Sequence, residues 1–154
     1  MNINQVCDYI IVQVTEAGEN LNLLKLQKLL YYTQAWHLAF YGKTAFDGKF
    51  QAWIHGPVNR TIYDRFSRNR SLYSEITEDD VQPGFDSRKI PKPLRSHIDI
   101  VLETYAKFSG SQLEEISHRE TPWQSARRGY RPSQRCEVVI DESVMKDYYK
   151  SRLK

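Results

Sequence analysis

The chain has 154 residues, of which 40% are hydrophobic, 12% aromatic and 27% charged. This length predicts one domain with a single core, which buries roughly 70% of the surface that the unfolded chain exposes. The apolar content excludes an intrinsically disordered chain, and a mean hydropathy of -0.63 without any run of ~18 apolar residues excludes a membrane span. The first five residues carry no basic charge, so we expect no secretory signal and place the protein in the cytoplasm.

Charge and cysteine content exclude further classes. The 22 Lys and Arg residues against 19 Asp and Glu residues give a net charge of +3, which is too small to indicate a nucleic-acid binder by itself. Cys7 and Cys136 lie far apart and neither belongs to a C-x-x-C pair. We expect both to be free thiols that act as small hydrophobic residues in a reducing compartment.

Apolar residues at helical spacing predict two helices in the N-terminal third. The first runs from Ile3 to Ala17 and ends at Gly18. The second covers residues 22–41 and ends at Gly42. Because this second helix is apolar or aromatic on nearly every face, other helices must surround it, or it must offer one face to a partner.

A short extended segment is expected at residues 50–55, where polar and apolar residues alternate briefly. Gly56 and Pro57 then interrupt the chain, and Pro57 at a first helical position predicts a third helix. The apolar face of that helix would consist of Val58, Ile62 and Phe66.

The second half of the chain begins with a loop at residues 82–93, which is dense in Pro, Gly and charge. A helix follows from Leu94 to Phe108, and two predicted capping boxes, at 111–114 and 121–124, start two short helices. The last helix spans about 141–152. The sequence therefore predicts a mostly α fold, a compact single-domain helical bundle of six to seven helices over residues 1–154. One short β element near residues 50–55 is compatible with this fold.

Few residues have the spacing of a metal, cofactor or catalytic site. The four histidines have no zinc-ligand spacing and no phosphate-binding glycine loop occurs, so we expect no metal and no cofactor. His118 and Glu120 could supply a base and its partner, and either cysteine a nucleophile, but the spacing does not bring them together. We therefore expect no enzyme, with His118 as a hydrogen-bonded residue at a helix end.

Several residues allow two interpretations from the sequence alone. His55-Gly56-Pro57 is either a structural joint or a recognition site, and Trp36 and Trp53 are either core residues or interface anchors. Trp123 is expected to face other helices. The Arg-rich segments 60–70 and 119–135 are interpreted as solvated faces, with contact to DNA as the alternative, because the arginines at 60–70 scatter around the predicted helix.

Three blocks of sequence, at residues 24–38, 52–58 and 118–127, occur together in one order. In them the chain resembles the Panacea domain, the family of SocA-like antitoxins that also includes phage-associated GepA-like proteins. The resemblance extends over almost the whole chain, down to the predicted C-terminal helix around residues 144–149.

The resemblance implies an α-helical antitoxin, encoded next to its toxin in bacteria or their phages, that neutralises the toxin by direct binding. In the SocA branch it implies instead an adaptor that delivers the toxin to a ClpXP-type protease. A DNA-binding regulator and a small hydrolase or transferase using His118 and Glu120 remain as alternatives from other classes. The family motif positions, either structural or in contact with the partner, are Lys25, Gln27, Lys28, Tyr32, Trp36, Trp53, His55, Gly56, Pro57, His118, Glu120, Pro122 and Trp123.

Overall fold

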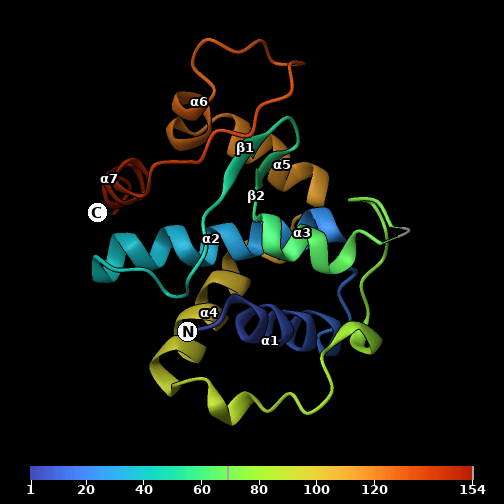
Figure 1. The fold of residues 1–154 in the computed structure, drawn as a ribbon. Coiled ribbons are helices and arrows are strands. Elements are labelled where there is room, and N and C mark those ends of the chain that lie inside the picture. Colours follow the sequence, from blue (N-terminus) through green and yellow to red (C-terminus); the bar gives the residue numbers. More distant parts are fainter. Residues whose placement is uncertain (69, 154) are drawn as a thin grey trace.

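The computed structural model describes residues 1–68 and 70–153, and these form seven α-helices and one two-stranded hairpin (Figure 1). The mostly α fold class is therefore confirmed, including the short β element. The elements are α1 (Ile3–Glu16), α2 (Leu23–Tyr41), β1 (Gln51–Trp53), β2 (Gly56–Val58), α3 (Arg60–Phe66), α4 (Lys92–Tyr105), α5 (Gly110–His118), α6 (Thr121–Ala126) and α7 (Glu142–Lys150). Two short 3-10 helices, Glu78–Asp80 and Ser87–Lys89, lie in the long connection before α4.

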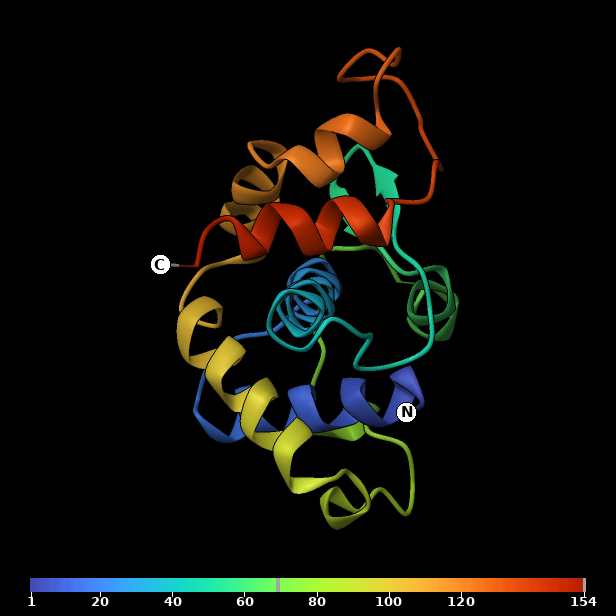
Figure 2. The ribbon, with the colours of Figure 1, turned by 90° about the vertical axis from the view of Figure 1, so that its left-hand side faces the viewer.

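Helix α2 is the centre of the molecule. Figure 2 views it nearly end-on, with α1 below it, α7 above it, and α4 and α3 on its two sides. Most of its residues are buried, among them polar ones, and this fits its apolar character on nearly every face. The prediction that other helices surround this segment is confirmed.

Local signals place the ends of the first two helices. The Asn22 side chain accepts a hydrogen bond from the Lys25 amide and so caps the start of α2. Gly42 ends the helix in the left-handed conformation, at φ 73°. Asn2 caps α1 in the same way as Asn22 caps α2. The predicted bounds of both helices are confirmed to within one residue.

The prediction for Pro57 is wrong. Pro57 lies in β2, where it pairs with Ala52 of the antiparallel β1, and it does not start a helix. Asn59 caps α3 instead, because its side chain accepts from the Ile62 amide. Proline fits this two-stranded hairpin because its missing N–H costs no ladder bond at a strand edge.

The two predicted capping boxes are also misplaced. Helix α5 starts two residues earlier than expected, with a capping box between Ser109 and Gln112. Helix α6 has Glu120 at its cap position without any side-chain cap, and Thr121 is its first residue. The Glu120 side chain makes no cap hydrogen bond because its carboxylate accepts from a tyrosine hydroxyl instead. This tertiary contact overrides the local capping pattern.

Two arginines of the Arg-rich segments are structural, which corrects the prediction of solvated faces at these positions. The Arg65 guanidinium pairs with Asp8, whose side chain is 1% exposed. Arg127 is 4% exposed and donates to the carbonyls of Ala52 and Gln134. Both side chains join segments that are distant in the sequence.

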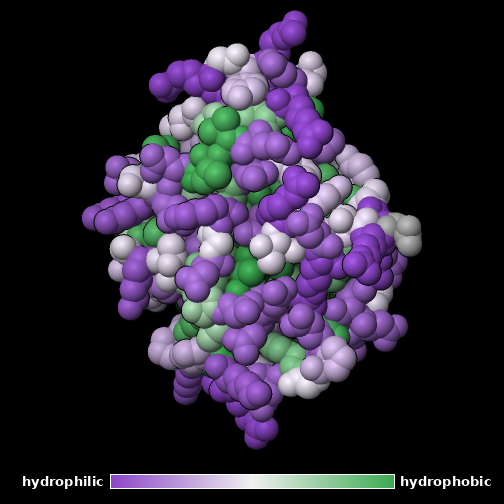
Figure 3. All heavy atoms as spheres, viewed as in Figure 1, coloured by the Kyte–Doolittle hydropathy of each residue, from purple (hydrophilic) through white to green (hydrophobic). Residues whose placement is uncertain are grey.

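Hydrophilic side chains cover most of the face shown in Figure 3, and apolar surface forms only small separate patches there. Over the described residues, the most exposed large apolar side chains include Phe40 and Tyr41 at the end of α2, at 50% and 57%. None of the helices described is both long enough and apolar enough to cross a membrane.

Candidate functional site

Two polar motif residues of α2, Gln27 and Lys28, point into the molecule and hold the hairpin. The Gln27 side-chain amide donates to the Asn59 carbonyl at 3.0 Å and accepts from the Asn59 N–H at 2.8 Å. One turn of the helix carries both this side chain and Lys28, whose Nζ donates to the Pro57 carbonyl at 2.9 Å. Both side chains are fully buried, so each bond replaces hydration that the backbone of β2 has lost.

Burial shapes the charge state of Lys28. Desolvation lowers the pKa of its ammonium from 10.5 to about 7, against the opposing attraction of the Glu114 carboxylate. Burial therefore favours the neutral amine more in the folded protein than in the unfolded chain. A neutral amine still donates to the Pro57 carbonyl, so the tie to the hairpin does not require the charge.

Gly56 lets the hairpin approach this lysine. Its φ is 97°, and an added Cβ would lie 2.6 Å from Lys28 Cε and 2.8 Å from Ser117 Oγ. Any side chain at this position would therefore push β2 away from both α2 and α5. The tripeptide His55-Gly56-Pro57 is a structural joint at its glycine and proline.

We expect Gly56→Ala to destabilise the protein by about 2 kcal/mol, since it adds backbone strain and a collision with Lys28. Gly129→Ala is the matched control, because Gly129 has φ 90° and open space around its Cβ position. That control should cost about 1 kcal/mol from backbone strain alone. Chemical denaturation of both variants measures the difference, and equal losses would show that the approach of Lys28 is not tight.

Glu120 joins α2 to α7 through two tyrosines. Its carboxylate accepts from the Tyr32 hydroxyl at 2.7 Å and from the Tyr149 hydroxyl at 2.8 Å. Burial raises the pKa of this carboxyl above its usual value, against the two hydrogen bonds, which lower it. Trp36 extends the cluster, since its indole N–H donates to the Tyr105 hydroxyl and the Tyr105 ring stacks on Tyr32.

His118 and Trp123 form a stacked pair beneath the hairpin, with ring centroids 4.1 Å apart. The Trp123 indole N–H donates to the Trp53 carbonyl at 2.8 Å, and the neighbouring Pro122 is buried in the first turn of α6. His118 lies at the end of α5 as expected, but its buried Nε2 has no hydrogen-bond partner in the described part of the chain. The expectation of a hydrogen-bonded ring therefore fails at this nitrogen, although the ring also makes a hydrogen bond to the Ile54 backbone, which opposes the lowering of its pKa by burial.

The residues proposed for catalysis do not assemble into a catalytic group. The Glu120 carboxylate faces the tyrosines, and no hydrogen bond joins it to His118 within residues 1–68 and 70–153. Burial raises the pKa of the Cys7 thiol to about 12, which disfavours the reactive thiolate, and Cys136 is also buried. In the described residues, no group of three His, Cys, Asp or Glu side chains could hold a metal ion.

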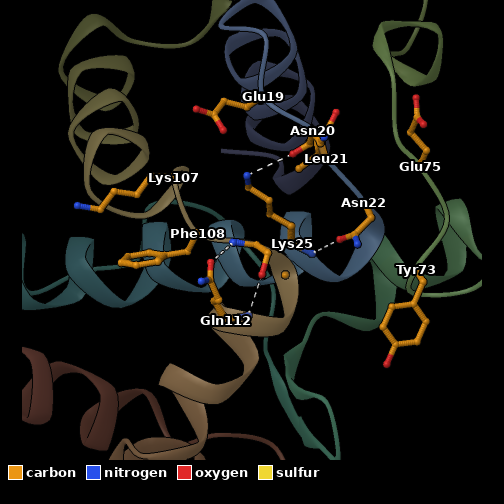
Figure 4. Close-up of a pocket in the computed structure, with 12 residues that line it drawn as sticks. Glu19, Asn20, Leu21, Asn22, Lys25, Tyr73, Glu75, Lys107, Phe108 and Gln112 are labelled. Atoms are coloured by element: carbon orange, nitrogen blue, oxygen red, sulfur yellow. Dashed lines mark hydrogen bonds between the residues drawn. The ribbon is translucent and has the colours of Figure 1, made fainter.

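Lys25 lies at a surface pocket of about 440 Å³ between α2, α5 and the segment before α2 (Figure 4). Its Nζ reaches the carbonyls of Asn20 and Ala106, and burial lowers its pKa. Glu19, Glu75 and Tyr73 surround the opening of this pocket. Since the lysine is engaged by the backbone, its role here is to fasten the turn before α2 to the end of α4.

A second depression lies beside the hairpin, and we call it the hairpin groove. It has a volume of about 320 Å³. Its lining consists of Trp53, Ile54, His55, Arg60, Tyr63, Arg135, Cys136 and Glu137. This groove contains the two motif side chains that remain half-buried on the hairpin, Trp53 and His55.

Aromatic rings and charged groups alternate in the hairpin groove. The Trp53 and Tyr63 rings meet edge to face at 4.8 Å, and the Arg60 guanidinium lies over both. His55 Nδ1 lies 3.0 Å from the Glu114 carboxylate at the rim. Tryptophan, tyrosine and arginine are the residue types that most often anchor protein interfaces.

The sequence pattern did not point to Glu137 as a site residue, and it placed Arg60, Tyr63 and Arg135 in the two segments considered for DNA. The signal for Arg60 and Tyr63 was present, because they are an arginine and an aromatic residue three positions apart on one predicted helix. No local signal links that helix to residues 135–137, which reach the groove only through the fold.

The comparisons with known proteins agree with the three sequence blocks. The family described as "Antitoxin SocA-like, Panacea domain" matches residues 26–124. Antitoxin SocA of Caulobacter vibrioides (strain NA1000 / CB15N) is 31% identical over 133 residues, which cover 82% of this chain and 71% of that protein. No solved structure matches the chain. The resemblance stated above is confirmed, and the chain belongs to the family of SocA-like antitoxins with a Panacea domain.

Proposed function

We propose that this protein is an antitoxin that neutralises a cognate protein toxin by direct binding and without catalysis, through the hairpin groove. Its membership of the SocA-like family supports the antitoxin role. In this proposal the toxin is the product of an adjacent gene, both proteins act in the cytoplasm, and residues 1–154 work as one domain.

The observation that carries the proposed surface is the convergence of the three sequence blocks on the hairpin. Gln27 and Lys28 of the first block bond to the backbone at Asn59 and Pro57. Trp123 of the third block bonds to the backbone of β1. A surface fixed in this way loses little conformational freedom when a partner binds, which favours affinity.

The chemistry of the hairpin groove suits a protein partner. Trp53 and Tyr63 offer apolar ring surface beside polar groups, and Arg60 presents a guanidinium held against both rings. A few such anchors supply most of the binding free energy of a typical interface. Covering the toxin's active surface then requires binding energy alone.

We expect Trp53→Ala to weaken the complex with the adjacent gene product by about 30-fold and to release toxicity in cells that express both proteins. Calorimetry on the purified pair measures the affinity, and growth after co-expression measures neutralisation. A melting curve of the free variant checks that its fold is retained, because Trp53 also packs on Tyr63.

Tyr41→Ala is the control, since it removes an exposed aromatic ring from the end of α2, which does not line the groove. It should leave affinity and neutralisation unchanged. If Tyr41→Ala releases toxicity and Trp53→Ala does not, the toxin binds the end of α2 and the proposed surface is wrong. If the wild-type protein neither binds nor neutralises the adjacent gene product, the proposed function itself is wrong.

The adaptor mechanism predicts a different result in cells that lack ClpXP. Steric neutralisation persists in such cells, whereas neutralisation by delivery to the protease is lost. The DNA-binding alternative has weaker support, because two arginines of the Arg-rich segments are engaged inside the fold. Arg65 pairs with the buried Asp8, and Arg127 donates to the carbonyls of Ala52 and Gln134.

A further inference from the structure

We infer that the hairpin groove binds an acidic segment of the toxin that carries an apolar side chain, and that Glu137 holds the place of the toxin's carboxylate in the free protein. This inference rests on the proposed function. Beyond the proposed function, it names the chemistry of the bound segment, and it identifies Glu137 as a side chain that competes with the toxin's carboxylate.

The position of Glu137 carries the inference. One oxygen of its carboxylate lies 2.8 Å from Arg135 Nη2 and 3.4 Å from Arg60 Nη1. The two arginines come from different parts of the chain, one from α3 and the other from the segment that leads toward α7. Two guanidinium groups on one carboxylate oxygen form a site for an anion, and the chain fills this site with its own side chain.

The three side chains are exposed enough to exchange partners. Arg60, Arg135 and Glu137 have exposed fractions of 49%, 81% and 45%. Ion pairs of this exposure contribute little to stability, so a carboxylate of a partner can displace Glu137 at small cost. Arg135 holds the pKa of Glu137 below its usual value, so Glu137 is ionised and competes as an anion.

The remaining lining defines the rest of the ligand. Trp53 and Tyr63 form an apolar wall beside Arg60, and the groove of about 320 Å³ accommodates a side chain or two. The complementary segment therefore places an aromatic or aliphatic residue next to Asp or Glu.

The test compares three variants, of which one should bind the toxin more tightly and two should bind it more weakly. Glu137→Gln frees both arginines and should tighten binding of the adjacent gene product about fivefold, whereas Arg60→Gln and Arg135→Gln should each weaken it about fivefold. Asp86→Asn and Arg88→Gln are matched controls, since they break an exposed ion pair of 3.0 Å outside the groove and should change nothing.

A synthetic peptide in which Asp or Glu alternates with aromatic residues is a second probe, compared with the same peptide carrying Asn and Gln. We expect the acidic peptide to bind more tightly, and Glu137→Gln to increase this preference. This arm does not depend on the toxin, so it separates failure of the inference from failure of the proposed function.

Two outcomes would overturn the inference. One is that Glu137→Gln weakens or does not change binding of both probes while the variant melts like the wild type. The other is that Glu137→Gln raises affinity for a double-stranded DNA oligonucleotide and leaves the acidic peptide unbound, which would assign the groove to nucleic acid.

Discussion

Trp123→Ala should lower the free energy of unfolding by about 3 kcal/mol, which makes it one of the most damaging single changes expected in this chain. The side chain is 9% exposed, stacks on His118 and donates to the Trp53 carbonyl. Its removal leaves a cavity under the hairpin and removes the indole hydrogen bond to the Trp53 carbonyl. Chemical denaturation measures the loss, and thermal melting should show a decrease of about 10 °C.

Trp123→Phe is the milder variant. It keeps one ring on His118 but removes the N–H donor and part of the buried ring volume, so it should cost about 1–2 kcal/mol. An unchanged melting temperature in the alanine variant would show that the ring is exposed in solution, and Trp123 would then become a candidate for contact with the toxin.

Lys28→Met should change the pH dependence of stability. The folded-state pKa of Lys28 is about 7, below the ordinary value of 10.5 in the unfolded chain. Between these values the unfolded chain binds a proton that the folded protein does not bind, so wild-type stability rises with pH through this range. The methionine variant lacks this contribution.

We therefore expect the stability of the wild type, relative to that of Lys28→Met, to increase by about 2 kcal/mol from pH 7 to pH 9, with a slope that approaches about 1.4 kcal/mol per pH unit above the folded-state pKa. Denaturant titrations of both proteins at several pH values give this difference, and comparing the two cancels the other titrating groups. Lys43→Met removes an exposed lysine and should retain the wild-type pH dependence. If the stability of Lys28→Met instead shows the same pH dependence as that of the wild type, the Lys28 ammonium stays protonated in the folded protein.

Both predictions follow from one arrangement, in which motif residues act mainly as internal ties. Gln27, Lys28 and Trp123 hold the hairpin, and Glu120 holds α7 against α2. In the proposed function, the face that meets the partner is made by the side chains between these ties. Variants of the ties should therefore reduce neutralisation through stability, and variants of the hairpin groove should reduce it through affinity.

The sequence predicted the helices well and their caps less well. Periodicity places α1 and α2 correctly, because side-chain spacing along one helix is a local property. It fails at Pro57, which has the right geometry for the start of a helix but pairs with Ala52. The capping-box pattern fails at 121–124, because the cap position of α6 is Glu120, whose carboxylate accepts from two tyrosine hydroxyls of other helices.

The sequence by itself determined the helical class, the membership suggested by three blocks in order, and the concentration of 10 of the 19 aromatic residues between positions 31 and 66. The tertiary structure alone decided which of those residues are exposed. Among them Trp53 is half-buried, whereas Tyr31 and Tyr32 are buried. The tertiary structure also buries Lys28, because the Pro57 carbonyl of a distant segment accepts a hydrogen bond from its Nζ. Arg135 and Glu137 likewise reach Arg60 only through the fold. The spacing of these residues in the sequence does not predict this contact.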